Sequence, residues 1–274
     1  MLSETDVGPY LRREIVFDSE PTMSVPATVL IPHDTSLAGV EPGASGWPAV
    51  LAVHGHGPGR TEICEPEPGG NFAHQLAVAG FVVLAPDLRG FGERAESTWN
   101  ATDWCDLNWV SATLFGVSPL TQNLWDLRCA LDVLGGLREV DADRVGACGF
   151  SYGATCALFL AAVDQRVRAA VVSGYFSSVA SSHRIPSNLC GSQVLPGMLG
   201  RIEHGDLGAL IMPRPLFVES CQDDVLFPAS AAADEVAHLH QLGMGLEHRV
   251  HPGDHHWVGD GVVEFFARTL NRTR

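Results

Sequence analysis

A serine in a G-x-S-x-G frame offers the clearest chemistry in this sequence. Ser151 lies between Gly149 and Gly153, where the apolar run 144–150 meets a run of small and apolar residues, 152–162. The first run predicts a buried strand and the second a helix. Glycines on both sides of the serine let the backbone form a tight turn that lifts the hydroxyl out of the sheet. This context, more than the pattern itself, predicts that Ser151 is a nucleophile.

A serine hydroxyl needs a base to take its proton, and the base needs an acidic partner to hold its tautomer. Candidates for both follow later predicted strands. The strand predicted over 216–219 leads to Asp223 and Asp224, and the strand predicted over 246–250 leads to His255 and His256. The order serine, acid, histidine is that of one large class of triads. From the residues alone, both members of each pair stay candidates.

The elements that must position these side chains alternate between strands and helices. Apolar strand runs are predicted at 49–53, 81–85, 144–150, 169–173, 216–219 and 246–251, and helices at 71–79, 118–136, 152–162, 229–242 and 262–270. Runs that are apolar on both faces and separated by helices indicate a mostly parallel central sheet with helices on both faces. Two antiparallel strands are predicted at 15–18 and 28–31. No repeat or linker interrupts the pattern, so a single domain over 1–274 is predicted.

Six segments carry a family resemblance. They are His54-Gly-His-Gly, Asp87-Leu-Arg-Gly-Phe-Gly, Gly-Phe-Ser151-Tyr-Gly, Pro213-Arg-Pro-Leu, Asp224-Val-Leu-Phe-Pro and Gly-Asp-His255-His-Trp. From about residue 49 to 268 the chain resembles the α/β-hydrolase superfamily, in its dienelactone-hydrolase-like and acetyl-xylan-esterase-like branch. The resemblance implies the α/β-hydrolase fold, and it selects Asp224 as the acid and His255 as the base. Dienelactone hydrolases proper use a cysteine nucleophile, whereas this chain has Ser151, which favours ester chemistry.

The loops beside the nucleophile contain the candidate oxyanion hole, which needs two backbone N–H donors. Tyr152 supplies one donor at the start of a helix, and His56 supplies the other from the loop after the first parallel strand. His54 and His56 could also ligate zinc, but no further ligand is spaced to complete a site. We therefore expect no metal and no cofactor, with His54 as a hydrogen-bonding residue that fixes its loop. Asp87 and Arg89 are likewise expected to structure a loop.

Two stretches, about 93–117 and 175–210, are predicted to be irregular insertions over the active site that form the pocket walls. The first contains Trp104 and Trp109, our candidate substrate-binding residues. Large aromatic faces can bind an apolar acyl or ring group. The alternative is that these tryptophans only hold the insertion against the body of the protein.

Composition narrows the class of protein. The 274 residues are 46% hydrophobic, as in globular proteins, and the net charge of −15 has no basic cluster to offset it, so we expect no nucleic-acid partner. The N-terminus lacks the pattern of a signal peptide, and no apolar run is long enough for a bilayer, so no membrane association is expected. Seven cysteines without C-x-x-C spacing suggest reduced thiols and a cytoplasmic location. The sequence leaves open whether the chain forms a homo-oligomer.

These observations predict a cytoplasmic serine hydrolase that cleaves a carboxylic ester of a small or medium-sized molecule through an acyl-enzyme on Ser151. One alternative is a serine peptidase, although no propeller-sized N-terminal region is present to gate peptides. A second is a natural-product tailoring enzyme that performs acyl transfer, cyclisation or elimination on the same scaffold. A third is a non-catalytic binding protein, which the presence of all three triad residue types disfavours.

Overall fold

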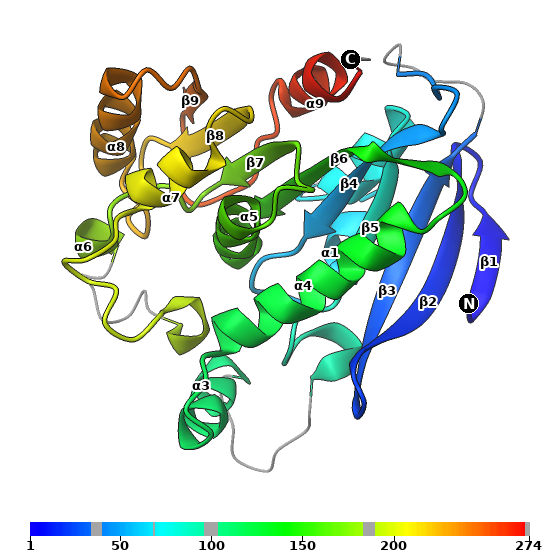
Figure 1. Ribbon diagram of the computed structural model, residues 1–274, viewed down its shortest axis with the longest axis horizontal. Coiled ribbons are helices and arrows are strands. Elements are labelled where there is room, and N and C mark those ends of the chain that lie inside the picture. Colours follow the sequence, from blue (N-terminus) through cyan, green and yellow to red (C-terminus); the bar gives the residue numbers. More distant parts are fainter. Residues whose placement is uncertain (34–39, 68, 96–103, 183–189, 272–274) are drawn as a thin grey trace.

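The computed structural model describes residues 1–33, 40–67, 69–95, 104–182 and 190–271, with the backbone alone for 104–106 (Figure 1). These residues form a nine-stranded sheet in the order β1-β2-β3-β5-β4-β6-β7-β8-β9. The strands are β1 (Ser3–Asp6), β2 (Tyr10–Glu20), β3 (Met23–Pro32), β4 (Trp47–Val53), β5 (Val82–Pro86), β6 (Val140–Phe150), β7 (Ala169–Ser173), β8 (Leu216–Cys221) and β9 (Glu247–His251). Strands β1 to β3 pair antiparallel, β3 also pairs antiparallel with β5, and every pairing from β5 to β9 is parallel. The mostly parallel sheet predicted from the sequence is confirmed.

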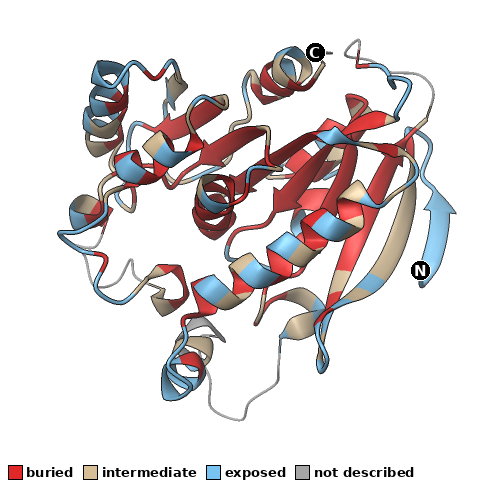
Figure 2. Cartoon of the chain, viewed as in Figure 1, coloured by how far each residue is buried: buried red, intermediate tan, exposed pale blue. Residues whose placement is uncertain are grey.

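Helices cover both faces of this sheet. They are α1 (Arg60–Cys64), α2 (Phe72–Val78), α3 (Trp104–Leu114), α4 (Pro119–Gly135), α5 (Tyr152–Val163), α6 (Val179–Ser182), α7 (His204–Ile211), α8 (Ala229–Gln241) and α9 (Val262–Leu270), with short 3-10 turns η1 (Gly92–Arg94) and η3 (Gly191–Gln193). Side chains of α4, α5, α7 and α8 share one hydrophobic core, and those of α1, α2 and α9 share the other. Strands β3 to β8 are mostly buried between the two cores, whereas β1 is exposed and β2 and β9 are mostly half-buried (Figure 2).

Strand β5 shows how one apolar run serves both cores. Val82 and Leu84 face the first core, whereas Val83 and Ala85 face the second, and all four are completely buried. Successive side chains of a strand point to opposite faces, so a strand covered on both sides must be apolar throughout. Burying one such valine or leucine stabilises the fold by about 1.5–3 kcal/mol.

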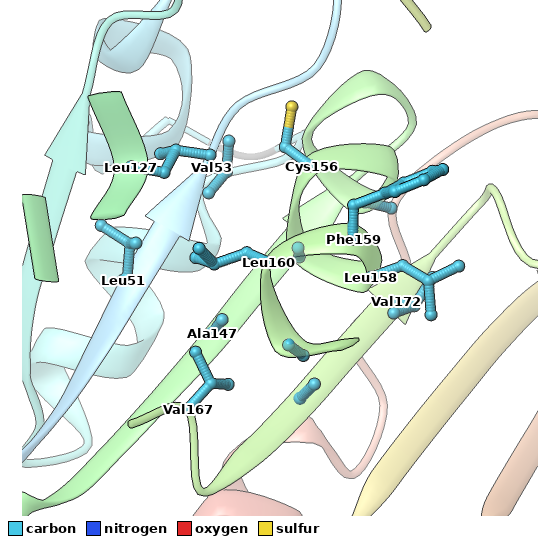
Figure 3. Close-up of a cluster of buried hydrophobic side chains, with 14 of the residues drawn as sticks. Leu51, Val53, Leu127, Ala147, Cys156, Leu158, Phe159, Leu160, Val167 and Val172 are labelled. Carbon is cyan, nitrogen blue, oxygen red and sulfur yellow. The ribbon is translucent and has the colours of Figure 1, made fainter. Parts of the chain in front are cut away.

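Helix α5 lies at the centre of the first core. Its residues 152–161 are all buried. Figure 3 shows Leu158 and Leu160 of this helix near side chains from the sheet, among them Leu51 and Val172. A helix enclosed in this way has little freedom to shift, so the turn that precedes it is held in place.

Local signals in the sequence located several elements closely. The bounds of β7 and α9 agree with the prediction. Helix α4 begins as predicted, with Ser118 as N-cap and Pro119 at the first helical position; the Ser118 side chain accepts a hydrogen bond of 3.2 Å from the Leu120 N–H. The N-terminal strands were predicted too short, and β1 was not predicted.

The prediction that 93–117 and 175–210 are irregular is wrong for much of the described part. The first contains η1 and the eleven-residue helix α3, and the second contains α6, η3 and most of α7. Leu107, Val110 and Leu114 of α3 are 36%, 57% and 82% exposed, so the apolar residues of this helix do not mark a face buried in a core. Among the described helices, none combines the length and the apolar composition that crossing a bilayer requires.

Candidate active site

Ser151 occupies a strained turn between β6 and α5. Its φ of 54° and ψ of −117° make it the one non-glycine residue with a positive φ among those the structure describes. Such a conformation costs of the order of 1–3 kcal/mol and persists only where surrounding contacts enforce it. The Ser151 N–H donates to the Ser173 carbonyl at 2.9 Å. A Cβ on Gly149 would overlap the backbone of Gly153, and one on Gly153 would overlap the Val53 carbonyl, so both glycines of the motif are required by space.

Three side chains predicted from different parts of the sequence meet at this turn. Nε2 of His255 lies 2.8 Å from Oγ of Ser151, and Nδ1 of His255 lies 2.7 Å from Oδ2 of Asp224. The rings of Phe150 and Phe227 flank the imidazole, with centroids 4.9 and 5.6 Å away. An ionised carboxylate only accepts hydrogen bonds, so Nδ1 holds the proton and the lone pair of Nε2 faces the hydroxyl. The arrangement can therefore remove the hydroxyl proton.

The structure also separates the paired candidates that the residues alone left open. Asp224 is 5% exposed and its carboxylate reaches His255, whereas Asp223 is exposed. Nδ1 of His256 instead lies 2.9 Å from the Asp254 carbonyl oxygen. Of the two aspartates and two histidines, the structure thus brings Asp224 and His255 to the serine.

The loop after β4 passes close to Ser151 because it contains glycine at position 55. A Cβ on Gly55 would lie 3.1 Å from the Phe150 carbonyl oxygen and 3.4 Å from Cβ of Ser151. The next residue, His56, has an exposed side chain whose ring lies 5.2 Å from that of Tyr152. The two residues predicted to offer oxyanion donors thus lie beside each other near the serine.

His54 fixes this loop, as the sequence predicted. Its ring is completely buried; Nδ1 donates to the Gly55 carbonyl at 2.7 Å, and Nε2 accepts from the Leu88 N–H at 3.1 Å. Burial lowers the pKa of His54, which keeps the imidazole neutral with both nitrogens engaged. Within the described ranges, no group of three or more His, Cys, Asp or Glu side chains is arranged to hold a metal ion.

Asp87 also has the loop-structuring role that was expected. It accepts hydrogen bonds from the backbone N–H groups of Arg60 at 2.8 Å and Glu93 at 3.0 Å, and it forms an ion pair with the Arg60 guanidinium. Arg60 pairs with the exposed Glu93 as well, and its buried pair with Asp87 joins the segment after β4 to the loop after β5. No local pattern in the sequence indicates this role of Arg60, because Arg60 lies 27 positions from its partner Asp87.

Arg89 and Asn123 connect the loop after β5 to helices α4 and α5. Arg89 forms two hydrogen bonds to Asp126, of 2.8 and 2.7 Å, and its N–H donates to the Asn123 amide oxygen at 2.9 Å. The Asn123 amide donates in turn to the Tyr152 hydroxyl at 2.7 Å. Asn123 therefore connects the loop after β5 to the first residue of α5. The sequence signal that could have identified Asn123 is a polar residue inside the apolar stripe of α4, which the structure shows to be fully buried.

The two candidate substrate-binding tryptophans lie in α3. The side chain of Trp104 is outside the described part of the structure. Trp109 is half-buried and covers Gly191 of η3, where an added Cβ would lie 2.6 Å from Cγ of the indole. Trp109 thus joins the first insertion to the second, a contact that supports a packing role.

Comparisons with known proteins concern the family and the fold. The model of the dienelactone hydrolase family matches residues 40–256. The curated protein "Putative hydrolase YtaP" of Bacillus subtilis (strain 168) is 30% identical over 131 residues, which are 45% of this chain. Those residues span 42% of that relative's length.

Solved structures share the whole fold at low sequence identity. A "putative acetyl xylan esterase" from Bacteroides fragilis NCTC 9343 superposes with a TM-score of 0.79 at 15% identity, covering 99% of this chain and 81% of that one. Acetyl Xylan Esterase 1 from Thermoanaerobacterium sp. JW/SL YS485 superposes with a TM-score of 0.69 at 18% identity, covering 98% and 86% of the two chains. At these identities the likeness concerns the fold.

Proposed function

Since this chain belongs to the dienelactone hydrolase family and has the α/β-hydrolase fold, we propose that it is a serine hydrolase that cleaves carboxylic esters of small or medium-sized molecules. The observation that carries this proposal is the hydrogen-bonded chain from Ser151 through His255 to Asp224, with contacts of 2.8 and 2.7 Å. We assign Ser151 as nucleophile, His255 as general base and Asp224 as the acid that orients the imidazole.

The reaction follows from these positions. Oγ of Ser151 attacks the ester carbonyl while Nε2 of His255 takes its proton, and Asp224 stabilises the resulting imidazolium. The negative charge on the carbonyl oxygen rests on the N–H groups of His56 and Tyr152. The tetrahedral intermediate collapses as His255 returns the proton to the leaving alkoxide, which departs as the alcohol. Water then attacks the acyl-enzyme with His255 again as base, and His255 returns the proton to Oγ of Ser151 as the acyl–oxygen bond breaks and the acid is released.

The nucleophile is an oxygen in this chain. The two cysteines nearest to Ser151 in sequence, Cys148 and Cys156, are completely buried, and burial raises the pKa of each thiol, so neither supplies a thiolate. Ser151, whose hydroxyl is activated by His255, is therefore the nucleophile that we assign.

The substrate pocket is proposed to lie between the insertions 93–117 and 175–210, on the side of the sheet where Ser151 emerges. The contact between Trp109 and Gly191 joins the two insertions and supports this location. Because two of the similar structures bear the name acetyl xylan esterase, acetylated sugars are the first compounds to test. We also propose a single domain over 1–274 and a cytoplasmic location, the latter because the structure shows free thiols at Cys64, Cys129, Cys148, Cys156 and Cys221.

The test is hydrolysis of a panel of p-nitrophenyl esters of graded acyl length, with an acetylated sugar, a lactone and a dipeptide amide. We expect ester turnover by the wild type and its near-complete loss in Ser151→Ala, with folding unchanged. Ser151→Ala activity within about tenfold of wild type would remove the serine mechanism. Turnover of the amide alone would favour a peptidase, and an ester product formed with an added alcohol would favour acyl transfer.

A further inference from the structure

A buried carboxylate that the reaction does not use lies between the strands around the active site. Glu219 is on β8, between β7 and β9 (Figure 1), and its side chain is 1% exposed. Oε2 accepts a hydrogen bond of 2.5 Å from Oγ of Ser173 and one of 3.4 Å from the Val258 N–H, and Oε1 accepts one of 2.8 Å from the Gly259 N–H. A buried charge is tolerated only where donors replace its hydration. Nε2 of His251, on β9, also lies 3.4 Å from Oε1, so the three donors and this imidazole together hold Glu219 in one place.

One end of this set of contacts reaches the nucleophile. Ser173, which donates its hydroxyl to Glu219, also accepts the Ser151 N–H on its carbonyl oxygen at 2.9 Å. The next residue, Gly174, donates its N–H to the backbone carbonyl of Glu219 at 3.0 Å. A Cβ on Gly174 would lie 3.2 Å from Cε1 of His255. The end of β7 thus lies next to both the serine turn and the histidine ring. Glu219 binds it through its carboxylate, at Ser173, and through its backbone carbonyl, at Gly174.

The other end reaches the segment that bears the base. Val258 and Gly259 follow His255 by three and four residues, and both donate their N–H groups to the Glu219 carboxylate. Between them and the base, Trp257 stacks on Phe72 of α2 with ring centroids 4.5 Å apart. The backbone after His255 is therefore anchored to β8 by polar contacts and to α2 by an apolar one.

We propose that Glu219 is a positioning residue that sets the distance between Ser151 and His255. The inference rests on the proposed function. One side chain joins the two segments that must keep Nε2 and Oγ 2.8 Å apart. Glu219 is enclosed by protein and acts through Ser173 and the Val258–Gly259 backbone rather than on the substrate. A displacement of about 1 Å between reacting groups costs roughly 10²-fold in rate, so a small relaxation of this bridge has a large effect.

The test compares two substitutions at Glu219. In Glu219→Gln the amide oxygen can accept from Gly259 while the NH₂ group faces Ser173, whose hydroxyl can turn and accept. We expect kcat to fall about tenfold in Glu219→Gln and about a hundredfold in Glu219→Ala, with KM within about twofold of wild type. The partial rescue by glutamine and the loss confined to kcat are the signatures of positioning.

A milder pair keeps the test valid if Glu219→Ala fails to fold. Ser173→Ala removes one donor to Glu219. Ser220→Ala is its control, because Ser220 is also buried and loses one comparable hydrogen bond, of 3.1 Å to Nε2 of His248. We expect Ser173→Ala to lower kcat about tenfold and Ser220→Ala to leave it unchanged. Equal kcat per folded molecule in Glu219→Gln, Ser173→Ala and Ser220→Ala would overturn the proposal.

A spectroscopic readout separates this inference from the proposed function. The Nδ1 proton of His255 should give a low-field ¹H NMR signal, assigned by its absence in His255→Ala. We expect this signal unchanged in Ser220→Ala and shifted or broadened in Glu219→Gln; an identical signal in both variants would overturn the positioning role. Wild-type protein without Ser151-dependent ester hydrolysis would refute the proposed function alone, because the NMR comparison does not need turnover.

Discussion

Replacing Asp224 with asparagine tests the proposed acid through its hydrogen bonds. Oδ1 of Asp224 accepts the N–H groups of Leu226 at 2.8 Å and Phe227 at 3.0 Å, while Oδ2 faces Nδ1 of His255. Asparagine has a single side-chain oxygen, and two backbone donors hold it at the Oδ1 position. The NH₂ group then faces His255, so Nδ1 must become an acceptor and the proton moves to Nε2. That nitrogen can no longer take the proton of Ser151.

The size of the loss in Asp224→Asn depends on how readily the asparagine amide can flip to present its oxygen to His255. Flipping the amide to restore an acceptor opposite His255 would place its NH₂ group against the N–H groups of Leu226, which is half-buried, and Phe227, which is buried. Leaving such donors unpaired costs about 1–3 kcal/mol each, so the flipped form is a minor one. Loss of the correct tautomer in a Ser-His-Asp triad lowers kcat about 10⁴-fold, or about 5.5 kcal/mol in activation free energy. KM should change little, because the substrate does not contact Asp224.

The assay compares Asp224→Asn with Asp223→Asn, which makes the same chemical change one residue away on an exposed side chain. Initial rates on the best ester of the panel should fall about 10⁴-fold for Asp224→Asn and stay within about twofold for Asp223→Asn. Thermal unfolding of both variants checks that the loss is not a folding defect. If Asp224→Asn kept more than about a tenth of the activity, or Asp223→Asn lost more, the assignment of the acid would be wrong.

Four further substitutions test other residues in and around the site. His255→Ala should remove ester turnover and His256→Ala should leave it near wild type; the opposite order in initial rates would reassign the base. Trp109→Ala should change the relative kcat/KM across the ester panel and also lower the unfolding free energy by about 2 kcal/mol, because the indole covers Gly191; a loss of stability with an unchanged ester profile would limit Trp109 to packing. Burial lowers the pKa of His54 in the native state, so below about pH 6.5 the unfolded chain binds a proton that the native state does not. The free energy of unfolding should therefore decrease as the pH falls below that value, by up to about 1.4 kcal/mol per pH unit. His54→Gln should lack that part of the slope in denaturant titrations between pH 7 and 5, and an unchanged slope would show that other groups cause it.

The parts of the fold that could be predicted are those whose cause is local. Strand β7 is a short run that must be apolar on both faces. Helix α4 begins where the Ser118 side chain accepts a hydrogen bond from a free N–H group of the first turn, and where Pro119 has no N–H group that would need a partner. Helix α3 gave no such signal, since its apolar residues Leu107, Val110 and Leu114 remain exposed. Periodicity reveals a helix only when one of its faces is buried.

The site residues, too, could be predicted only where the cause of their position is local. Ser151 is visible in sequence because its turn demands glycines nearby, whereas the choice between Asp223 and Asp224 depends on which side chain the loop turns inward. Glu219 shows most clearly what cannot be predicted from the sequence. It is the one charge in the apolar run of β8, and the cost of burying it implies that donors must exist. Those donors come from the end of β7 and from the segment after His255, about 40 residues away on either side, and nothing in the spacing of residues could have named them. A lone buried charge in a predicted strand therefore tells where to look for a connection between catalytic loops, and the fold alone tells which loops it joins.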